Sequence, residues 1–318
     1  MSMSIEPLMK KKWNFNDMPD QSGKIVVVTG ANSGLGFIAT RELAKRNAEV
    51  IMACRNLEKA GKAKNDILKQ YPNAKLHVMK LDQASLASVK TFAEEFKSKF
   101  SKLDILLNNA GIMQPPKRET EDGFELQIGV NHLGQFALTG QLFDALKKSK
   151  NARVVAVSSI AHKTGKINFE DLMSEKKYSR NAAYSQSKFA NVLFGYELAR
   201  KLKEHNINNI KSVVSHPGYS NTSLQQNGPA IGGKSMLSRI YAVTDRLIAM
   251  SADKGSLSLL YACTMPDVES GDFIGPGGIY QARGFPKRYK SVKSTYNEED
   301  AKKLWEVSEN LTGIKFSF

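Results

Sequence analysis

The chain has 318 residues, of which 41% are hydrophobic, enough apolar side chain to pack one large domain. Its 46 Lys and Arg residues outnumber 31 Asp and Glu residues and give a formal net charge of +15, but they are scattered along the chain. The basic clusters at 10–12 and 287–293 have only isolated aromatic neighbours, so we do not predict nucleic-acid binding.

Cysteine, histidine and apolar content limit the remaining classes of protein. Cys54 and Cys263 are too few for a disulfide framework and too distant in sequence for a metal-ligand pair. The five histidines are dispersed, so we predict no metal site. Residues 1–12 carry no signal-peptide pattern, and no window approaches the roughly 18 apolar residues of a membrane span. We expect a cytoplasmic protein.

Short β-branched runs alternate with longer segments of helical periodicity from residue 24 onward. In chain order we predict strands at 24–29, 50–54, 75–80, 103–107, 153–158 and 210–215, with helices at 35–47, 57–70, 85–100, 125–146 and 183–205. This alternation predicts βαβ units and a parallel sheet, and strands that are apolar throughout indicate a sheet covered on both faces. The predicted fold is a Rossmann-like, doubly wound, three-layer α/β/α sandwich.

Composition also predicts the domain organisation. No Pro-rich, Gly/Ser-rich or single-sign stretch interrupts the chain, so we expect an N-terminal arm at 1–21 and a single domain at 22–318. The amphipathic run 235–250 is expected either to pack on the domain or to belong to a substrate lid at 219–250. Trp305 and the segment to Phe318 are expected to form a terminal helix and tail packed on the domain.

Three glycines follow the first predicted strand and open the first predicted helix. Gly30 permits a tight turn, Gly34 lets the backbone approach a pyrophosphate, and Gly36 allows close packing of the helix on the sheet. N–H groups at the start of that helix would face the anion. The turn therefore predicts a dinucleotide site that also includes Asn32, Ser33 and Leu35.

The end of the second strand indicates which dinucleotide binds. An acidic residue there usually holds a ribose 2′-hydroxyl, whereas arginine accommodates a 2′-phosphate. No acid occurs between Val50 and Leu57, and Arg55 with Asn56 stands at the strand end. The residues favour NADP(H), the alternative being an arginine that is merely exposed at a loop.

Tyr184 and Lys188 are four residues apart, which places both side chains on one face of a helix. A neighbouring ammonium is expected to lower the tyrosine pKa, so that the phenol can exchange a proton with a carbonyl or alcohol. Ser159 follows a predicted strand and could hold the substrate oxygen, with Ser158 as the alternative. These residues predict oxidoreductase chemistry, and no G-x-S-x-G elbow indicates a hydrolase.

The glycine turn at 29–36 (T-G-A-N-S-G-L-G) resembles the T-G-x-x-x-G-x-G turn of short-chain dehydrogenases, and the resemblance extends from residue 23 to the end. N-N-A-G at 108–111 and P-G-x-x-x-T at 217–222 are further family segments. The resemblance implies a catalytic tetrad of Asn131, Ser159, Tyr184 and Lys188. It also implies cofactor contacts from Tyr184, Lys188, Asp82, Asn109, Ala110, Gly111, Pro217, Gly218 and Thr222.

Within the family, the chain resembles the branch of retinol dehydrogenases, the WW-domain oxidoreductase and protochlorophyllide reductases. The residues that carry this resemblance are A-C-R-N at 53–56, E-D-G-F-E-L-Q-I-G-V-N-H-L-G at 121–134 and the long gap between Ser159 and Tyr184. It implies hydride transfer between NADP(H) and an apolar carbonyl or alcohol. Residues 1–21 lack the apolar anchor of membrane-bound retinol dehydrogenases, so a retinoid substrate is not predicted. The alternative is a catalytically idle NADP-binding sensor or scaffold, and the oligomeric state is not predicted.

Overall fold

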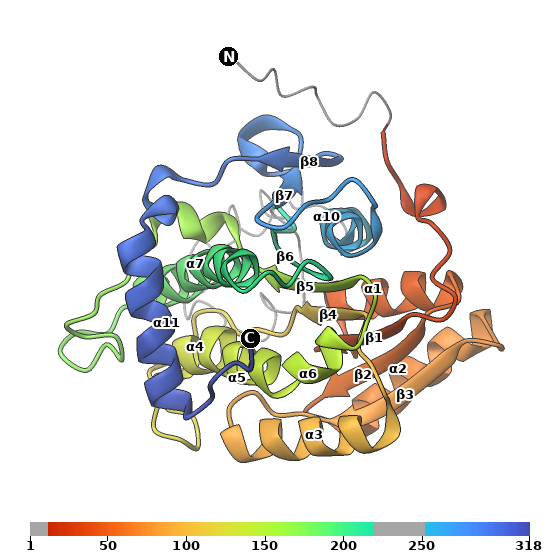
Figure 1. The fold of residues 1–318 in the computed structure, drawn as a ribbon, viewed down its shortest axis with the longest axis horizontal. Coiled ribbons are helices and arrows are strands. Elements are labelled where there is room, and N and C mark those ends of the chain that lie inside the picture. The colour runs from red at the N-terminus through yellow and green to blue at the C-terminus, as the bar shows by residue number, and fades with distance from the viewer. Residues whose placement is uncertain (1–11, 219–251) are drawn as a thin grey trace, which may run out of the picture.

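The computed structural model describes residues 12–218 and 252–318. Its strands are β1 (Ile25–Thr29), β2 (Glu49–Cys54), β3 (Lys75–Lys80), β4 (Ile105–Asn108), β5 (Ala152–Val157), β6 (Ile210–Ser215), β7 (Phe273–Pro276) and β8 (Pro286–Tyr289). They form one sheet in the order β3-β2-β1-β4-β5-β6-β7-β8, parallel except for the β7–β8 pair (Figure 1). The predicted doubly wound parallel sheet is confirmed.

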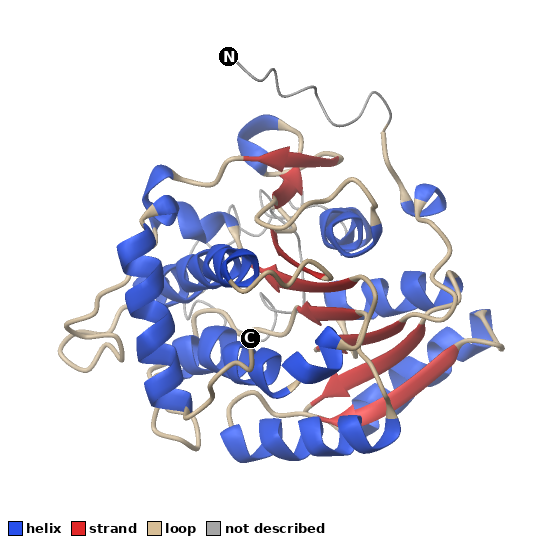
Figure 2. Ribbon diagram, in the orientation of Figure 1, coloured by secondary structure: helices blue, strands red, loops and turns tan. Residues whose placement is uncertain are grey.

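Helices cover both faces of this sheet (Figure 2). The α-helices are α1 (Gly34–Lys45), α2 (Leu57–Gln70), α3 (Leu86–Lys99), α4 (Leu126–Ile128), α5 (Gly134–Gln141), α6 (Phe143–Lys147), α7 (Arg180–Glu204), α10 (Ala252–Thr264) and α11 (Glu298–Thr312). Shorter turns are η1 (Phe15–Asp17), η2 (Gly129–Leu133), η3 (Ile160–Thr164), η4 (Ile279–Gln281) and η5 (Lys293–Tyr296). Helices α1, α2 and α10 share one apolar cluster, whereas α3, α5, α6 and α7 share another.

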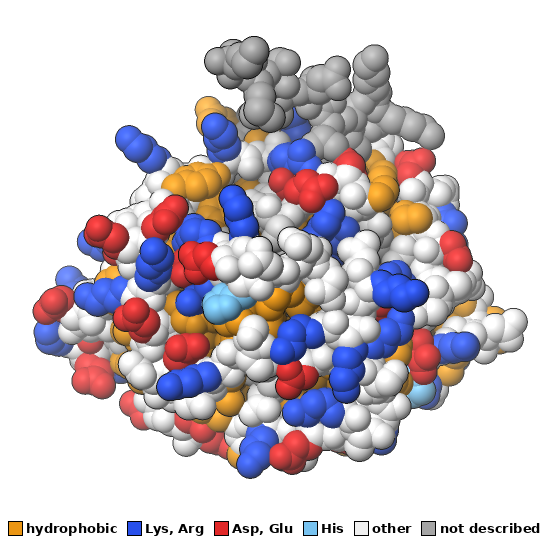
Figure 3. Space-filling model, viewed as in Figure 1, with side chains coloured by type: hydrophobic (Ala, Val, Ile, Leu, Met, Phe, Trp, Pro, Cys, Tyr) orange, Lys and Arg blue, Asp and Glu red, His pale blue; other side chains and the backbone are white. Residues whose placement is uncertain are grey.

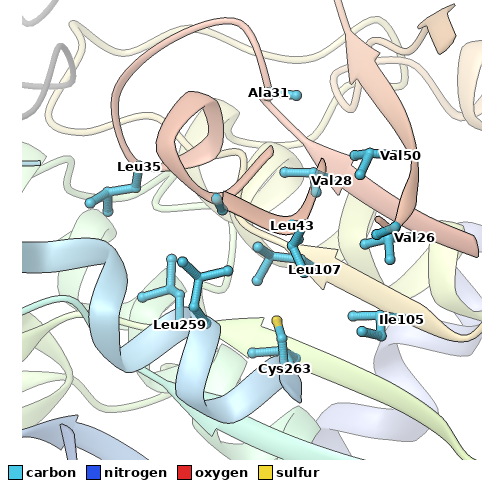
Figure 4. Packing of buried hydrophobic residues seen from close by; sticks show 14 of the residues in the cluster. Val26, Val28, Ala31, Leu35, Leu43, Val50, Ile105, Leu107, Leu259 and Cys263 are labelled. Atoms are coloured by element: carbon cyan, nitrogen blue, oxygen red, sulfur yellow. The ribbon is translucent and has the colours of Figure 1, made fainter. Parts of the chain in front are cut away.

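Alternation along β1 builds both halves of the core. Val26 and Val28 belong to the cluster on the α1 and α10 side (Figure 4), whereas Val27 belongs to the cluster on the opposite side. All three are fully buried. Successive side chains of a strand point to opposite faces, so a strand covered on both sides is apolar at every position. This explains the continuous run of valines.

The predicted helix 125–146 is wrong as one continuous element. The Glu125 carboxylate accepts hydrogen bonds from the N–H groups of Gln127 and Ile128, which starts α4. The next five residues form η2, a π-helical turn, before α5 begins. A break at Leu142 then separates α5 from α6. π-helical turns within helices occur frequently at functional sites, and Asn131 lies in this one.

The expected terminal helix and tail are present. The Trp305 ring of α11 stacks on Phe194 of α7, with the ring centroids 5.9 Å apart. In the tail, the ring of Phe316 lies 4.6 Å from that of Trp305. Part of the N-terminal arm is packed as well, because Trp13 is only 3% exposed and contacts the ring of Tyr261 at 5.4 Å.

Candidate active site

The turn between β1 and α1 has the geometry that its glycines predict. Gly30 and Gly34 have φ angles of +68° and +54°, in the left-handed region that glycine adopts without a steric cost. A Cβ atom on Gly36 would collide with the carbonyl oxygen of Gly30. Because the turn is this tight, the N-terminus of α1 lies directly after the end of β1, where it can receive an anion.

The end of β4 is hydrogen-bonded to the end of β1. The hydroxyl oxygen of Thr29 accepts from the N–H groups of Asn109 at 3.0 Å and Ala110 at 2.8 Å. The Asn109 side chain donates to the carbonyl oxygen of Thr29 at 2.8 Å. The strand order reverses between these two strands, and ligands of open α/β sheets bind at such a reversal. Asn109 and Ala110 therefore lie beside the glycine turn.

Arg55 lies at the end of β2 with 73% of its side chain exposed. Its Nε atom is 4.0 Å from a carboxylate oxygen of Asp82, which follows β3. Asn56 caps α2, since its side-chain oxygen accepts from the N–H of Lys59. The structure thus brings Arg55 and Asp82 together at the same edge of the sheet. The side-chain oxygen of Asn56 is used in the capping hydrogen bond of α2.

Tyr184 and Lys188 lie on one face of α7, both buried. The Lys188 ammonium is 5.9 Å from the centroid of the Tyr184 ring and donates to the carbonyl oxygen of Val157 at 3.2 Å. The Tyr184 hydroxyl shares a hydrogen bond with the side chain of Ser159. The end of β5 and the first turns of α7 therefore bring a serine, a tyrosine and a lysine together.

Asn131 reaches the same place from the π-helical turn η2. Its amide group donates to the carbonyl oxygen of Ile112 and to the hydroxyl of Ser187, both at 2.9 Å, and its oxygen accepts from the N–H of Ile112 at 2.8 Å. A Cβ atom on Gly111 would lie 3.0 Å from the Asn131 oxygen and 3.3 Å from the Lys188 ammonium. The predicted tetrad is therefore connected: Asn131 and Lys188 meet at Gly111, and Lys188 lies beside Tyr184, which contacts Ser159.

The electrostatics of this region differ from one expectation. Burial raises the pKa of Tyr184, and the hydrogen bond with Ser159 offsets this only in part. Burial also lowers the pKa of Lys188 to about 8. The expected lowering of the tyrosine pKa by the lysine is therefore wrong for this arrangement, because the loss of solvent around the phenolate outweighs the favourable contacts.

Several residues that support the site were not singled out from the sequence. Gln135 donates to the carbonyl oxygen of Ala110, and Asn191 donates to Gln135 and to the carbonyl oxygen of Val157. Gln135 and Asn191 stand one helical turn beyond Asn131 and Lys188, and this helical spacing could have identified them.

The segment after β6 is described only as far as Gly218. Gly218 has a φ angle of +76°, and its N–H donates to Nδ1 of His216 at 3.2 Å. Pro217 and Gly218 follow β6, at the same edge of the sheet as the tetrad. Thr222 and the predicted lid at 219–250 lie outside the described residues.

The family model for short chain dehydrogenases matches residues 24–230, more than half of the chain. The chain is a short chain dehydrogenase. Its catalytic and cofactor residues by number stay predictions, supported by the convergence described above.

Two relatives place this short chain dehydrogenase within the retinol dehydrogenase-like branch of the family. Retinol dehydrogenase 14 of Mus musculus is 39% identical over 302 residues, which cover 92% of this chain and 86% of the relative. Retinol dehydrogenase 12 of Homo sapiens is 39% identical over 300 residues, covering 92% and 88% of the two chains.

Solved structures agree with the fold of this dehydrogenase. The crystal structure of an uncharacterised protein from Mycobacterium paratuberculosis is 39% identical, with a TM-score of 0.80, and covers 97% of this chain and 100% of its own. A Pseudomonas aeruginosa RhlG complex with NADP has a TM-score of 0.63 at 22% identity, covering 82% and 98% of the two chains. At that identity the second likeness shows the fold alone.

Family membership makes this chain an oxidoreductase that acts on alcohols or carbonyls with a nicotinamide cofactor. None of the helices in the described ranges is long and apolar enough to cross a membrane. Among the same residues, no group of three or more His, Cys, Asp or Glu side chains could hold a metal ion. On the face in Figure 3, basic and acidic side chains are interspersed, so this face does not form the contiguous basic surface typical of nucleic-acid binding.

Proposed function

We propose that the protein catalyses hydride transfer between NADP(H) and an apolar aldehyde, ketone or alcohol. The observation that carries the proposal is that Asn131 and Lys188 meet at Gly111, with Tyr184 beside Lys188 and bonded to Ser159. A protein that only sensed NADP(H) would need the glycine turn but not a tyrosine hydroxyl bonded to a serine. The intact tetrad therefore favours an enzyme over a sensor or scaffold.

The residues present fit a dinucleotide. The left-handed glycines at 30 and 34 and the start of α1 form a cradle for a pyrophosphate, which backbone N–H groups would bind. Gly111 leaves open a space that a Cβ atom would fill, beside Lys188. In our proposal, Asn109, Ala110 and Gly111 line the adenosine-ribose side and Lys188 holds the nicotinamide ribose. Pro217 and Gly218 would lie beside the nicotinamide.

The preference for NADP(H) over NAD(H) is proposed from Arg55. Its guanidinium is mostly exposed at the end of β2, where a 2′-phosphate would accept its hydrogen bonds. The carboxylate of Asp82 lies within ion-pair distance of Arg55, and the Arg55 side chain stays mostly exposed beside it. The positive charge of an arginine at this place would attract the 2′-phosphate of NADP(H), whereas the uncharged 2′-hydroxyl of NAD(H) does not need it.

The chemistry follows from the positions of the side chains. When bound, the nicotinamide ring supplies or accepts the hydride. The Tyr184 hydroxyl gives its proton to the substrate oxygen during reduction and takes one back during oxidation. Ser159 positions that oxygen by a hydrogen bond, and the Lys188 ammonium is a positive charge 5.9 Å from the Tyr184 ring centroid. Asn131, bonded to Ile112 and Ser187, holds the backbone beside the lysine in place.

An apolar substrate is proposed from the surroundings of the tetrad. Ile112 and Met113 directly follow Gly111, Ile160 directly follows Ser159, and all three side chains are partly exposed. Apolar side chains with a few convergent polar groups are typical of small-molecule sites. The names of the relatives make a retinoid a second candidate, so retinaldehyde belongs in the substrate screen.

The test is an NADPH-oxidation screen with aldehydes, ketones and quinones of graded size, comparing wild type with Tyr184→Phe. Loss of the proton donor should lower kcat by about 10²–10⁴ while NADPH affinity persists. Tyr196→Phe is the matched control, because Tyr196 also lies on α7 but bonds to Ser291 instead. Tight NADPH binding without turnover of any substrate would favour the sensor, and an unchanged rate in Tyr184→Phe would refute the mechanism.

A further inference from the structure

Two buried histidines lie behind the proposed site and outside the tetrad. His162 belongs to η3, which Ser159 caps, and His216 directly precedes Pro217. Both are fully buried, with their ring centroids 6.3 Å apart, and Phe273 of β7 packs against the two rings at 5.1 Å and 5.3 Å. A Cβ atom on Gly275 would collide with Nε2 of His216. The neighbouring strand therefore has glycine where the second ring needs space.

Each ring has a backbone partner that fixes its tautomer. Nδ1 of His162 lies 2.6 Å from the carbonyl oxygen of Ser159. A carbonyl oxygen only accepts, so this Nδ1 carries the hydrogen, and Nε2 of the neutral ring is an acceptor. Nδ1 of His216 accepts from the N–H of Gly218, so its neutral ring carries the hydrogen on Nε2.

The two remaining ring nitrogens are therefore complementary. Nε2 of His162 is an acceptor and Nε2 of His216 is a donor, and both are buried without a hydrogen-bond partner among the described residues. Leaving a buried polar atom unpaired is unfavourable, and ordered water commonly bridges such groups. Burial lowers the pKa of both rings, that of His216 to about 3, so both are neutral at ordinary pH.

We propose that His162 and His216 form a hydrogen-bonded pair, bridged by one buried water between their Nε2 atoms, that fixes Ser159 relative to the Pro217–Gly218 turn. His162 bonds to the backbone of the serine that would hold the substrate oxygen. His216 bonds to the turn that would lie beside the nicotinamide. The pair thus couples the substrate side of the site to the cofactor side. Both histidines are positioning residues, and their effect on turnover rests on the proposed oxidoreductase function.

The first test reads the tautomers without any turnover. Nitrogen-15 NMR of the histidine rings should show His162 protonated at Nδ1 and His216 at Nε2. In His216→Phe, the Nε2 resonance of His162 should move because its donor is lost, whereas His77→Phe, at a histidine on β3, should leave it in place. The same tautomer on both rings, or an unmoved His162 resonance in His216→Phe, would overturn the pair.

The second test uses conservative variants of His162. Asn places an N–H donor near the position of Nδ1, and Gln places a polar group near Nε2. If the pair positions Ser159, His162→Asn should keep the hydrogen bond to the Ser159 carbonyl oxygen but lose the bond toward His216. His162→Gln should keep the bond toward His216 but lose the bond to Ser159. Each variant should lower kcat about 10-fold or more, with little change in NADPH Kd, because small misplacements of reacting groups are costly.

A double variant separates coupling from two independent structural effects. If the histidines act as a pair, His162→Asn combined with His216→Phe should lower kcat no more than the worse single change. If the fold losses of kcat in the two single variants multiply in the double variant, the two histidines act independently and the pair is overturned. If no substrate turns over, the oxidoreductase proposal fails but the NMR still tests the pair. If turnover is normal and the tautomers are wrong, only the pair fails.

Discussion

The hydroxyl of Ser158 donates a hydrogen bond to the carbonyl oxygen of Lys188 at 2.7 Å, deep in the protein. This bond ties the end of β5 to α7 one turn beyond Tyr184. It also favours Ser159, the serine of the predicted tetrad, over the alternative Ser158. Ser158 is committed to the backbone of α7, whereas Ser159 is the serine whose side chain bonds to the Tyr184 hydroxyl.

We therefore predict opposite outcomes for the two serines. Ser159→Ala should lower kcat by about 10²–10³, the usual effect of losing a hydrogen bond to a reacting oxygen, with a loss of stability no larger than that of the η3 cap. Ser158→Ala should lower the free energy of unfolding by about 1 kcal/mol through the lost buried hydrogen bond, with the smaller effect on kcat. Thermal unfolding and single-turnover rates of both variants test this. A larger rate loss in Ser158→Ala would reverse the assignment.

Gly111→Ala is predicted to damage the site rather than the fold. The added methyl group would lie 3.0 Å from the Asn131 oxygen and 3.3 Å from the Lys188 ammonium, in the space proposed for the cofactor. NADPH Kd should rise about tenfold or more, because the methyl group would displace the cofactor from a contact. A tenfold rise corresponds to a loss of about 1.4 kcal/mol of binding free energy. Gly61→Ala in α2 is the control, because nothing lies within 4 Å of that Cβ. Unchanged affinity in Gly111→Ala would place the cofactor elsewhere.

The sequence predicted those parts of the fold whose signal is local. Strands β1 to β6 were predicted because each contains a short run of apolar or β-branched residues that can be recognised in the sequence of that segment alone. Strands β7 and β8 were missed, because each has four residues and the two meet at Pro276 and Pro286. Strand β7 is defined by pairing with distant β6, where Val214 lies opposite Phe273.

The candidate site shows the same division. The spacing of Tyr184 and Lys188 places them on one helix face, and the structure has them there. The raised pKa of Tyr184 could not be predicted, because the cause is burial by segments remote in sequence. The bond from Ser158 to α7 likewise depends on how β5 and α7 pack.

Asp104 is predicted to make stability depend on acid pH. Burial raises the pKa of its carboxyl, but hydrogen bonds from Lys102, Ser149 and the N–H of Ile25 outweigh burial and lower the pKa below the usual value. A lowered carboxyl pKa contributes stability that is present above the unfolded pKa of about 3.9 and is lost as pH falls through the folded pKa.

Asp104→Asn should therefore lower the free energy of unfolding by about 1–3 kcal/mol at pH 7, where charged hydrogen bonds are lost. The difference from wild type should shrink as pH falls below about 4. Urea unfolding across this range measures it. A difference independent of pH would show that the carboxylate charge is not what Asp104 contributes.

Arg55→Asp is predicted to narrow or reverse the preference for NADPH over NADH. The change removes the exposed guanidinium at the end of β2 and places a carboxylate where a 2′-phosphate would lie. Lys59→Asp, at an exposed residue in the first turn of α2, makes the same change of charge nearby and should affect the preference far less. Affinities are compared at one salt concentration, because surface charge effects are screened. Equal wild-type affinity for both cofactors would make Arg55 a surface residue only.

The last prediction concerns the charge of Lys188. Burial lowers the pKa of its ammonium to about 8, and only the charged form would attract the anionic cofactor and donate to ribose hydroxyls. NADPH Kd should therefore be nearly constant from pH 7 to about 8 and rise up to about tenfold per pH unit above it. In Lys188→Met this dependence should disappear and the affinity at pH 7 should be lower. The same slope in both proteins would assign the titration to another group.

Stability supplies an independent measurement of the same group. Because the folded pKa of Lys188 lies below the unfolded value of about 10.4, the unfolded chain binds more protons than the folded chain between about pH 8 and 10.4. The buried charge thus destabilises the fold fully below about pH 8, and this cost is relieved as pH rises. The free energy of unfolding of wild type relative to Lys188→Met should rise by on the order of 3 kcal/mol across that window. Because Met has no titrating group, a flat difference between the two proteins would mean that Lys188 keeps an ordinary pKa in the folded chain.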